Sequence, residues 1–125
     1  MKAQTGHIVF KGQFKYKSLS KPFEELLKAF LEETDQMPDE DDIMQMFLRI
    51  NLMDLEKNRK PEGYNRRGRM RLIFPQPTER KEMYIRADAK TALVVRVTER
   101  LSKVLKKAGV AHTIEYDQLK TLQET

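Results

Sequence analysis

The amino-acid sequence predicts an α+β fold, a two-layer sandwich in which a small, mostly antiparallel sheet carries helices on one face. The prediction depends on two kinds of periodicity. Polar and apolar residues alternate over 7–17, 69–74 and 82–87, which is the period of a half-buried strand. Apolar residues recur at helical spacing over 20–31, 38–55 and 89–108, and a last strand is expected at 110–116. The order is therefore β-α-α-β-β-α-β, and short sheets of this kind pack against helices.

Residues 7–17 are expected to form one half-buried strand with a bulge or hairpin at Gly12. The helix that follows is the clearest in the chain. Ser20 is the expected N-cap, and Pro22 lies in the first turn, where its missing N–H costs nothing. The apolar residues of this helix form one stripe that faces the core: Phe23, Leu26, Leu27, Phe30 and Leu31.

A second helix is expected to begin near Pro38. Four acidic residues at 39–42 crowd its first turn, where they either cap the helix and complement its dipole or bind a partner. Its predicted apolar face consists of Ile43, Met46, Phe47, Ile50 and Met53, widened by Leu48, Leu52 and Leu55. A surface this broad covers more than one neighbour, so the helix is either sandwiched in the core or meets another chain. The methionines around it favour core packing, although thioethers also suit adaptable interfaces.

The C-terminal half predicts a unit of two strands, a helix and a strand. Residues 69–74 and 82–87 are expected to be strands joined by a hairpin loop that contains Pro75 and Pro77. The helix at 89–108 has an apolar stripe and a basic opposite face, and the cations near its C-terminal end suit the helix dipole. Gly109 is its expected stop.

Length and composition narrow the class of protein. A chain of 125 residues is expected to form a single domain, over residues 1–125, with one core. Its 24 Lys and Arg residues against 19 Asp and Glu give a formal net charge of +5, which favours polyanionic partners such as nucleic acid. No apolar run approaches the roughly 20 residues that span a bilayer, and the first residues do not resemble a signal peptide. We therefore expect a cytoplasmic protein without a membrane partner.

The sequence offers little for catalysis. It contains two histidines and no cysteine, so the commonest general bases and nucleophiles are scarce. No phosphate-binding loop, nucleophile elbow or dinucleotide fingerprint occurs. The acidic run at 39–42 resembles a magnesium site in composition, but consecutive residues on a helix diverge by about 100°, so at most two of them could share one ion. We expect no enzymatic activity, no metal site and no cofactor.

The most informative segment for function spans residues 57–71, in which seven of fifteen side chains are cationic. Pro61, Gly63 and Gly68 keep it out of a helix or a central strand, so we expect a loop excursion at about residues 57–69. Guanidinium groups grip phosphates in a bidentate way, and a tyrosine ring stacks on bases. The predicted nucleic-acid-binding residues are Arg59, Lys60, Tyr64, Arg66, Arg67, Arg69 and Arg71.

We therefore predict a small, basic, non-enzymatic protein that binds nucleic acid, with RNA or single-stranded DNA favoured over duplex DNA. Two further groups of cations could extend the contact: Lys11, Lys15 and Lys17, or Arg96, Arg100, Lys103 and Lys107. Two alternatives stay open. The cations of 57–71 could simply solvate a loop. The protein could also be an assembly module that forms a homodimer, or docks another protein, through the methionine-rich helix at 38–55.

Overall fold

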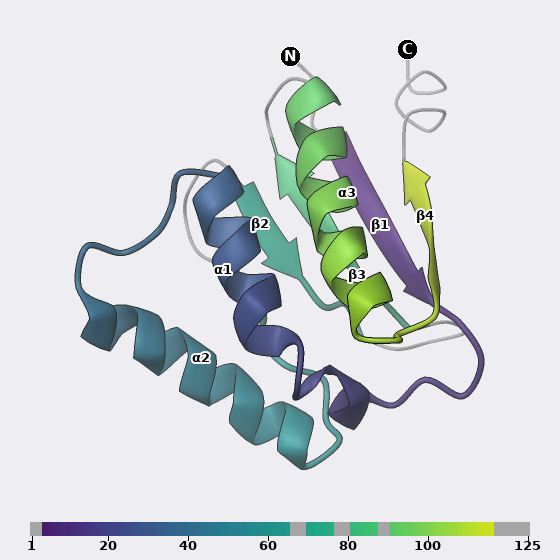
Figure 1. The fold of residues 1–125 in the computed structure, drawn as a ribbon, viewed down its shortest axis with the longest axis horizontal. Coiled ribbons are helices and arrows are strands. Elements are labelled where there is room, and N and C mark those ends of the chain that lie inside the picture. The colour runs from purple at the N-terminus through teal and green to yellow at the C-terminus, as the bar shows by residue number, and fades with distance from the viewer. Residues whose placement is uncertain (1–3, 66–69, 77–80, 88–90, 117–125) are drawn as a thin grey trace.

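The computed structural model describes residues 4–65, 70–76, 81–87 and 91–116 (Figure 1). Its strands are β1 (Gln4–Phe10), β2 (Met70–Ile73), β3 (Glu82–Ala87) and β4 (His112–Tyr116). Its helices are the short 3₁₀ helix η1 (Tyr16–Leu19), α1 (Phe23–Glu33), α2 (Asp41–Glu56) and α3 (Thr91–Lys107). The predicted α+β class and element order are confirmed. None of the described helices is both long enough and apolar enough to cross a membrane.

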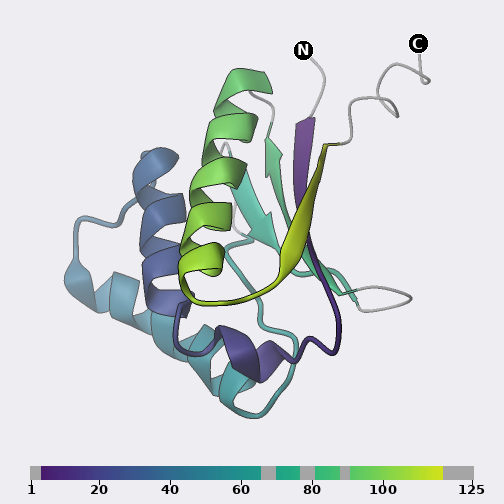
Figure 2. The ribbon, with the colours of Figure 1, turned by 45° about the vertical axis from the view of Figure 1, so that its right-hand side comes forward.

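The four strands form one antiparallel sheet in the order β2-β3-β1-β4. β1 therefore lies between β3 and β4, although it comes first in the chain. β1 and β2, which are connected through α1 and α2, are separated in the sheet by β3. β3 and β4, which are connected through α3, are separated by β1. This is the split β-α-β topology of ferredoxin-like folds. α1 and α3 cover one face of the sheet, and α2 packs on α1 and η1 (Figures 1 and 2).

The core lies between the sheet and the helices α1 and α3. Alternate strand residues point into it, among them Ile8 of β1, Leu72 of β2 and Ile85 of β3, all fully buried. The apolar stripe predicted for α1 is buried as expected: Phe23, Leu26, Leu27, Phe30 and Leu31. At one point the sheet and α3 approach very closely, because a Cβ atom added to Gly6 of β1 would overlap Oγ1 of Thr98.

The predicted strand at 7–17 is too long. β1 ends at Phe10, and the chain then turns through Gly12, whose φ of 66° lies in the left-handed region that favours glycine. Phe14 folds back so that its ring stacks on that of Phe10, with 3.9 Å between the centroids, and Tyr16 is buried at the start of η1. The alternating pattern crosses the turn because the aromatic residues on both sides of it pack inward.

The predicted N-cap of α1 is also wrong. Ser20 closes η1, since its backbone N–H donates to Lys17 O at 3.1 Å, and Pro22 is the residue that precedes α1. No side chain among the described residues caps this helix by a hydrogen bond. Its first turn instead carries Glu24 and Glu25, which place negative charge at the positive end of the helix dipole.

The buried and exposed faces of α2 differ from the prediction. Four residues of α2 are buried: Met44, Leu48, Asn51 and Leu55. Most of the predicted apolar face is exposed, since Ile43, Met46, Ile50 and Met53 are 37%, 49%, 39% and 51% exposed, so the helix is not sandwiched in the core. Phe47 is half-buried at the boundary between the two faces. The sequence contains two overlapping apolar stripes, and the one that packs inward is the one interrupted by the polar Asn51.

Candidate nucleic-acid interface

The first half of the basic segment, residues 57–65, leaves α2 in a fixed direction. Asn58 adopts a left-handed φ of 56°, and the N–H of Arg59 donates to Asp54 O at 2.8 Å. The side-chain oxygen of Asn58 accepts a hydrogen bond from the backbone N–H of Lys17 in η1, at 3.1 Å. The end of α2 is thereby tied to the segment that precedes α1.

A buried amide holds the next part of the segment. Asn51 is 1% exposed, and its Oδ1 accepts the N–H of Gly63 at 2.7 Å while its Nδ2 donates to Gly63 O at 3.2 Å. The same Nδ2 also donates to Phe47 O, at 2.8 Å. The Asn51 side chain thus pairs with both backbone polar groups of Gly63, as a neighbouring strand would, and it is satisfied although buried.

Tyr64 joins the segment to the edge of the sheet. Its N–H donates to Leu72 O at 2.8 Å and its carbonyl accepts the Leu72 N–H at 3.0 Å, which makes an antiparallel bridge to β2. Its ring lies against Phe30 of α1 and Phe47 of α2, at centroid distances of 5.8 and 5.3 Å. The described part of the predicted excursion is therefore anchored at several points, and the ring of Tyr64 is packed rather than free.

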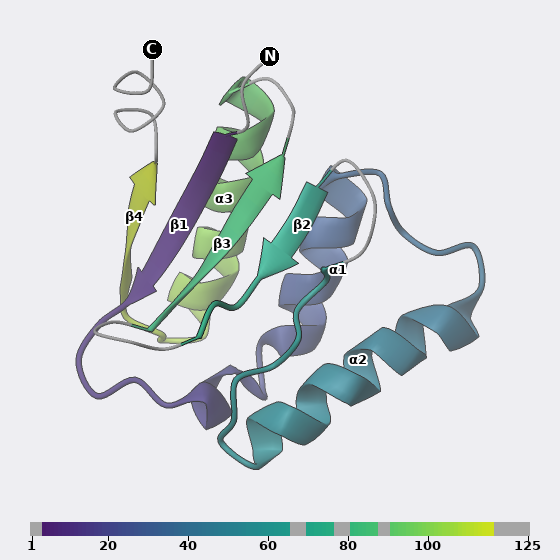
Figure 3. The ribbon, with the colours of Figure 1, turned by 180° about the vertical axis from the view of Figure 1, so that it is seen from behind.

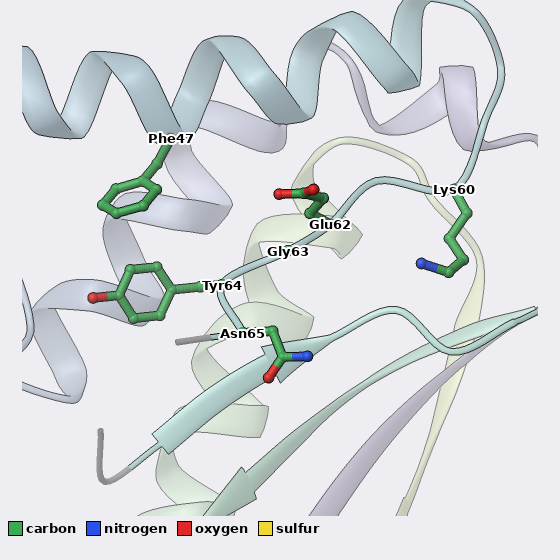
Figure 4. Close-up of a pocket in the computed structure, with 6 residues that line it drawn as sticks. All are labelled: Phe47, Lys60, Glu62, Gly63, Tyr64 and Asn65. Carbon is green, nitrogen blue, oxygen red and sulfur yellow. The ribbon is translucent and has the colours of Figure 1, made fainter. Parts of the chain in front are cut away.

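A cleft of about 330 Å³ opens between α2 and this segment (Figure 4). It is lined by Phe47, Lys60, Glu62, Gly63, Tyr64 and Asn65. Figure 4 shows the rings of Phe47 and Tyr64 together at one end of the cleft and Lys60 at the other. The volume is near the lower limit of about 300 Å³ for small-molecule sites. Two rings, an amide, an ammonium group and the carboxylate of Glu62 line the cleft, so it suits a planar polar ligand, and its two charges oppose each other.

The predicted binding residues occupy different places. Lys60 and Tyr64 share the cleft, whereas Arg59 is not among the residues that line it: it follows α2, is 58% exposed and pairs with Asp54 at 3.1 Å. Three of the predicted residues lie outside the described residues: Arg66, Arg67 and Arg69. The structure therefore brings two members of the predicted set together and separates a third from them.

The last predicted residue, Arg71, lies on the sheet face that points away from α1 and α3, and we call this the uncovered face (Figure 3). Its cross-strand partner is Arg86 of β3, so two cationic side chains stand directly opposite each other. Within the described residues neither guanidinium has an ion-pair partner, and no described element covers this face.

Two rings stack at the centre of the uncovered face. His7 of β1 is the cross-strand partner of Tyr84 of β3, and their rings lie 5.0 Å apart at an angle of 27°. His7 Nδ1 lies 2.6 Å from a carboxylate oxygen of Glu82, and its Nε2 lies 3.0 Å from Oγ1 of Thr5. Both ring nitrogens are therefore occupied, and the imidazole is held in a fixed orientation beside the tyrosine ring.

Sequence reasoning did not assemble the group on the uncovered face. The alternation over 82–87 does predict that Tyr84 and Arg86 lie together on the polar face of their strand. The position of His7 beside Tyr84 follows from the strand order β2-β3-β1-β4, and because β1 and β3 are distant in the chain, no local pattern indicates this pair. Arg71 and Arg86 lie on the two strands of the predicted hairpin, but the alternating pattern does not fix the register that places them opposite each other.

The cations of α3 do not extend this site. Three of the four predicted cations pair with carboxylates of α1: Arg100 lies 2.7 Å from Glu32, Arg96 lies 3.1 Å from Glu33, and Lys107 lies 2.8 Å from Glu25. The fourth, Lys103, is exposed on the same helix. The hydrogen bond that Arg100 donates to Glu32 raises the pKa of Arg100 above its usual value. The basic face predicted for this helix thus stabilises a helix pair, and its exposed ion pairs contribute little each. The predicted extension through Lys11, Lys15 and Lys17 starts from the turn and η1, not from a strand.

Among the described residues, no three His, Asp or Glu side chains come together in a way that could hold a metal ion. No protein-family model, no curated protein and no solved structure matches this chain. The site is therefore interpreted from its geometry alone.

We expect the substitution Asn51→Leu to lower the free energy of unfolding by about 2 kcal/mol, because it leaves the buried N–H and carbonyl of Gly63 without partners. Urea denaturation followed by circular dichroism measures the effect. The control is Gln45→Leu, the same helix and a similar change at an exposed position, with an expected effect within about 0.5 kcal/mol. Equal effects at the two positions would contradict the anchoring role of Asn51.

Proposed function

We propose that this protein binds single-stranded nucleic acid, RNA or single-stranded DNA, without catalysing a reaction, and that it does so in the cytoplasm. The observation that supports this most strongly is the group on the uncovered face, where the Arg71–Arg86 pair lies beside the stacked rings of His7 and Tyr84. Phosphate-binding cations and base-stacking rings are the two components that single-strand recognition requires.

The arginine pair has a cost that a phosphate would remove. Like charges directly opposite each other on neighbouring strands destabilise a sheet, and no described carboxylate pairs with Arg71 or Arg86. A phosphate bound between them would accept hydrogen bonds from both planar guanidinium groups, and such charge-assisted bonds are about twice as strong as neutral ones. The repulsion between Arg71 and Arg86 is therefore a cost to the unliganded fold, and a bound anion would remove it.

The position of β2 at the edge of the sheet suggests a path for the bound nucleic acid. Arg71 belongs both to the uncovered face and to the basic segment, whose residues Arg66, Arg67 and Arg69 precede it directly in sequence. Arg71 is therefore the residue at which the uncovered face and the basic segment meet in sequence. Unpaired bases stack in the same way on the exposed sheet of the RNA-recognition motif. This is an analogy between arrangements, and no evolutionary relationship is implied.

The test is a fluorescence anisotropy titration with a short labelled oligouridylate at several salt concentrations. The double variant Arg71→Ala/Arg86→Ala is expected to bind about tenfold more weakly, and its plot of log K against log salt should be shallower by about 1.4, which is about 0.7 for each lost phosphate contact. The matched control, Arg96→Ala/Arg100→Ala, removes the same charge from the far side of the sheet and should bind like the wild type.

Two further variants separate stacking from charge. Tyr84→Ala should weaken binding by about 1–3 kcal/mol while leaving the salt slope unchanged, because it removes a stacking surface and no cation. The triple variant Arg66→Ala/Arg67→Ala/Arg69→Ala should bind several-fold more weakly with a flatter slope. A wild-type protein that does not bind oligonucleotides at low salt would contradict the proposal. An equal loss of affinity in the Arg71→Ala/Arg86→Ala variant and in its control would contradict it as well.

A further inference from the structure

The exposed apolar residues of α2 form one continuous strip, which we call the α2 strip: Ile43, Met46, Ile50 and Met53. They are spaced by three, four and three residues, which is the spacing of the a and d positions over two heptads of a coiled coil. Each side chain is between 37% and 51% exposed, although isoleucine and methionine are usually buried in soluble proteins. A contiguous apolar strip on an otherwise charged helix marks an interaction surface.

We propose that the α2 strip is the interface between two copies of this chain, packed with their α2 helices antiparallel about a two-fold axis. The spacing is self-matching in this arrangement. When Ile43 of one copy lies opposite Met53 of the other, Met46 lies opposite Ile50, and both pairs share a midpoint at Leu48. Each contact then joins an a position to a d position, and the same patch serves both copies, as a two-fold interface requires.

The charges at the two ends of α2 favour the same arrangement. The acidic run at 39–42 precedes the strip, whereas Lys57, Arg59 and Lys60 follow it. In the antiparallel register Lys57 of one copy lies opposite Asp39 of the other, and the dipoles of the two helices are also opposed. A parallel pair would bring acidic end to acidic end and basic end to basic end. An acidic run thus precedes the strip and a cationic segment follows α2, so an antiparallel pair brings segments of opposite charge together at each end of the interface.

Two like-charged approaches remain. The antiparallel register brings Asp42 of one copy near Asp54 of the other, and Glu40 near Glu56. The structure relieves the first, because the carboxylate of Asp54 pairs with Arg59 of its own chain at 3.1 Å, whereas the second lowers the expected affinity of the dimer. A membrane surface fits the strip less well. Helices that lie in the interface of a bilayer carry mainly Lys and Arg on their polar face, whereas α2 begins with an acidic run and carries Asp54 and Glu56 near its end.

The interface is short, so the expected dimer is weak. Two heptads supply less area than the roughly 800 Å² per partner of a standard interface, and we expect a dissociation constant on the order of tens of micromolar. The average mass of the wild-type protein should therefore rise from monomer to dimer in sedimentation equilibrium as the concentration is raised through this range.

The first variant is Met46→Glu, which places a charge from each copy near the two-fold axis and should weaken dimerisation at least tenfold. Because Met46 is 49% exposed in the monomer, the fold should be unaffected, and circular dichroism checks this. The matched control is Gln45→Glu, which adds the same charge to an exposed neighbour outside the strip and should dimerise like the wild type.

A charge exchange tests the register. Asp39→Lys and Lys57→Glu should each weaken the dimer several-fold, and the double variant should recover the wild-type dissociation constant because the two ends again complement each other. The proposal is overturned by a wild-type protein that stays monomeric well above this concentration range, by a Met46→Glu variant that dimerises like the wild type, or by a double variant that does not recover. Recruitment of the wild-type monomer to anionic lipid vesicles, abolished by Met46→Glu, would assign the strip to a membrane and would also overturn it.

Discussion

Replacing Gly63 by alanine is expected to lower the free energy of unfolding by about 3 kcal/mol or more. Gly63 has a φ of 74°, a conformation that costs an L-residue about 1–2 kcal/mol. A Cβ atom at this position would also overlap the backbone carbonyl of Leu72, which accepts the N–H of Tyr64. This carbonyl belongs to β2 and cannot rotate away as the end of a side chain would. The bridge of Tyr64 and the hydrogen bonds of Asn51 would therefore be strained together.

The chain contains a control that separates backbone conformation from steric overlap. Gly12 has a similar φ of 66°, but a Cβ atom there would meet nothing within 4 Å. Gly12→Ala should therefore cost only the conformational part, about 1–2 kcal/mol. Urea denaturation of both variants, with the same probe and buffer, gives the comparison. Equal losses of stability would show that the approach of Leu72 does not constrain Gly63.

The second large effect is expected at Gly6, where alanine should cost about 2–3 kcal/mol. A Cβ atom at this position would overlap Oγ1 of Thr98, a residue with no exposed surface. The hydroxyl of Thr98 donates to Val94 O at 2.8 Å, so a change of rotamer would break a buried hydrogen bond. The alternative is a displacement of α3 from the sheet, which would loosen the core on both sides.

A double-mutant cycle tests this contact. Thr98→Ala alone should be mildly destabilising, by about 1 kcal/mol, since it removes one methyl group and one hydrogen bond within the helix. In the double variant Gly6→Ala/Thr98→Ala the overlapping oxygen is absent, so the combined loss should be well below the sum of the single losses. Strict additivity, within about 0.5 kcal/mol, would contradict the close approach of β1 and α3.

Burial could be predicted most accurately from the sequence where a single hydrophobic periodicity dominates an element. The stripe of α1 contains only large apolar residues, and it is buried as expected. α2 was predicted as a helix, but the part of its broad apolar surface that is buried could not be assigned, because the buried stripe includes the polar Asn51, whose partner Gly63 is found only in the folded chain. β1 was predicted too long for a related reason. Phe14 and Tyr16 pack inward from a turn and from η1, and a pattern of inward-facing residues does not distinguish these from a strand.

The candidate site was predicted only in part. The cationic character of residues 57–71 is a property of composition, so it could be read directly. The anchoring of Tyr64 between Phe30 and Phe47 depends on how two helices pack, and the stack of His7 on Tyr84 depends on strand order. Pairs of this kind join residues that are far apart in the chain, whereas periodicity and capping patterns describe only neighbours within about two turns.

The central position of β1 has a consequence for biosynthesis. β1 is made first, but both of its neighbours, β3 and β4, come from the second half of the chain, so its two hydrogen-bonding edges stay open until those strands have emerged. Closure of the sheet depends on distant pairs such as Gly6 with Tyr116, and such contacts form slowly. During that interval an apolar strand containing Ile8 and Phe10 is open to pairing with other nascent chains. The topology that places two rings at the centre of the uncovered face therefore makes the protein vulnerable to aggregation until β4 is in place.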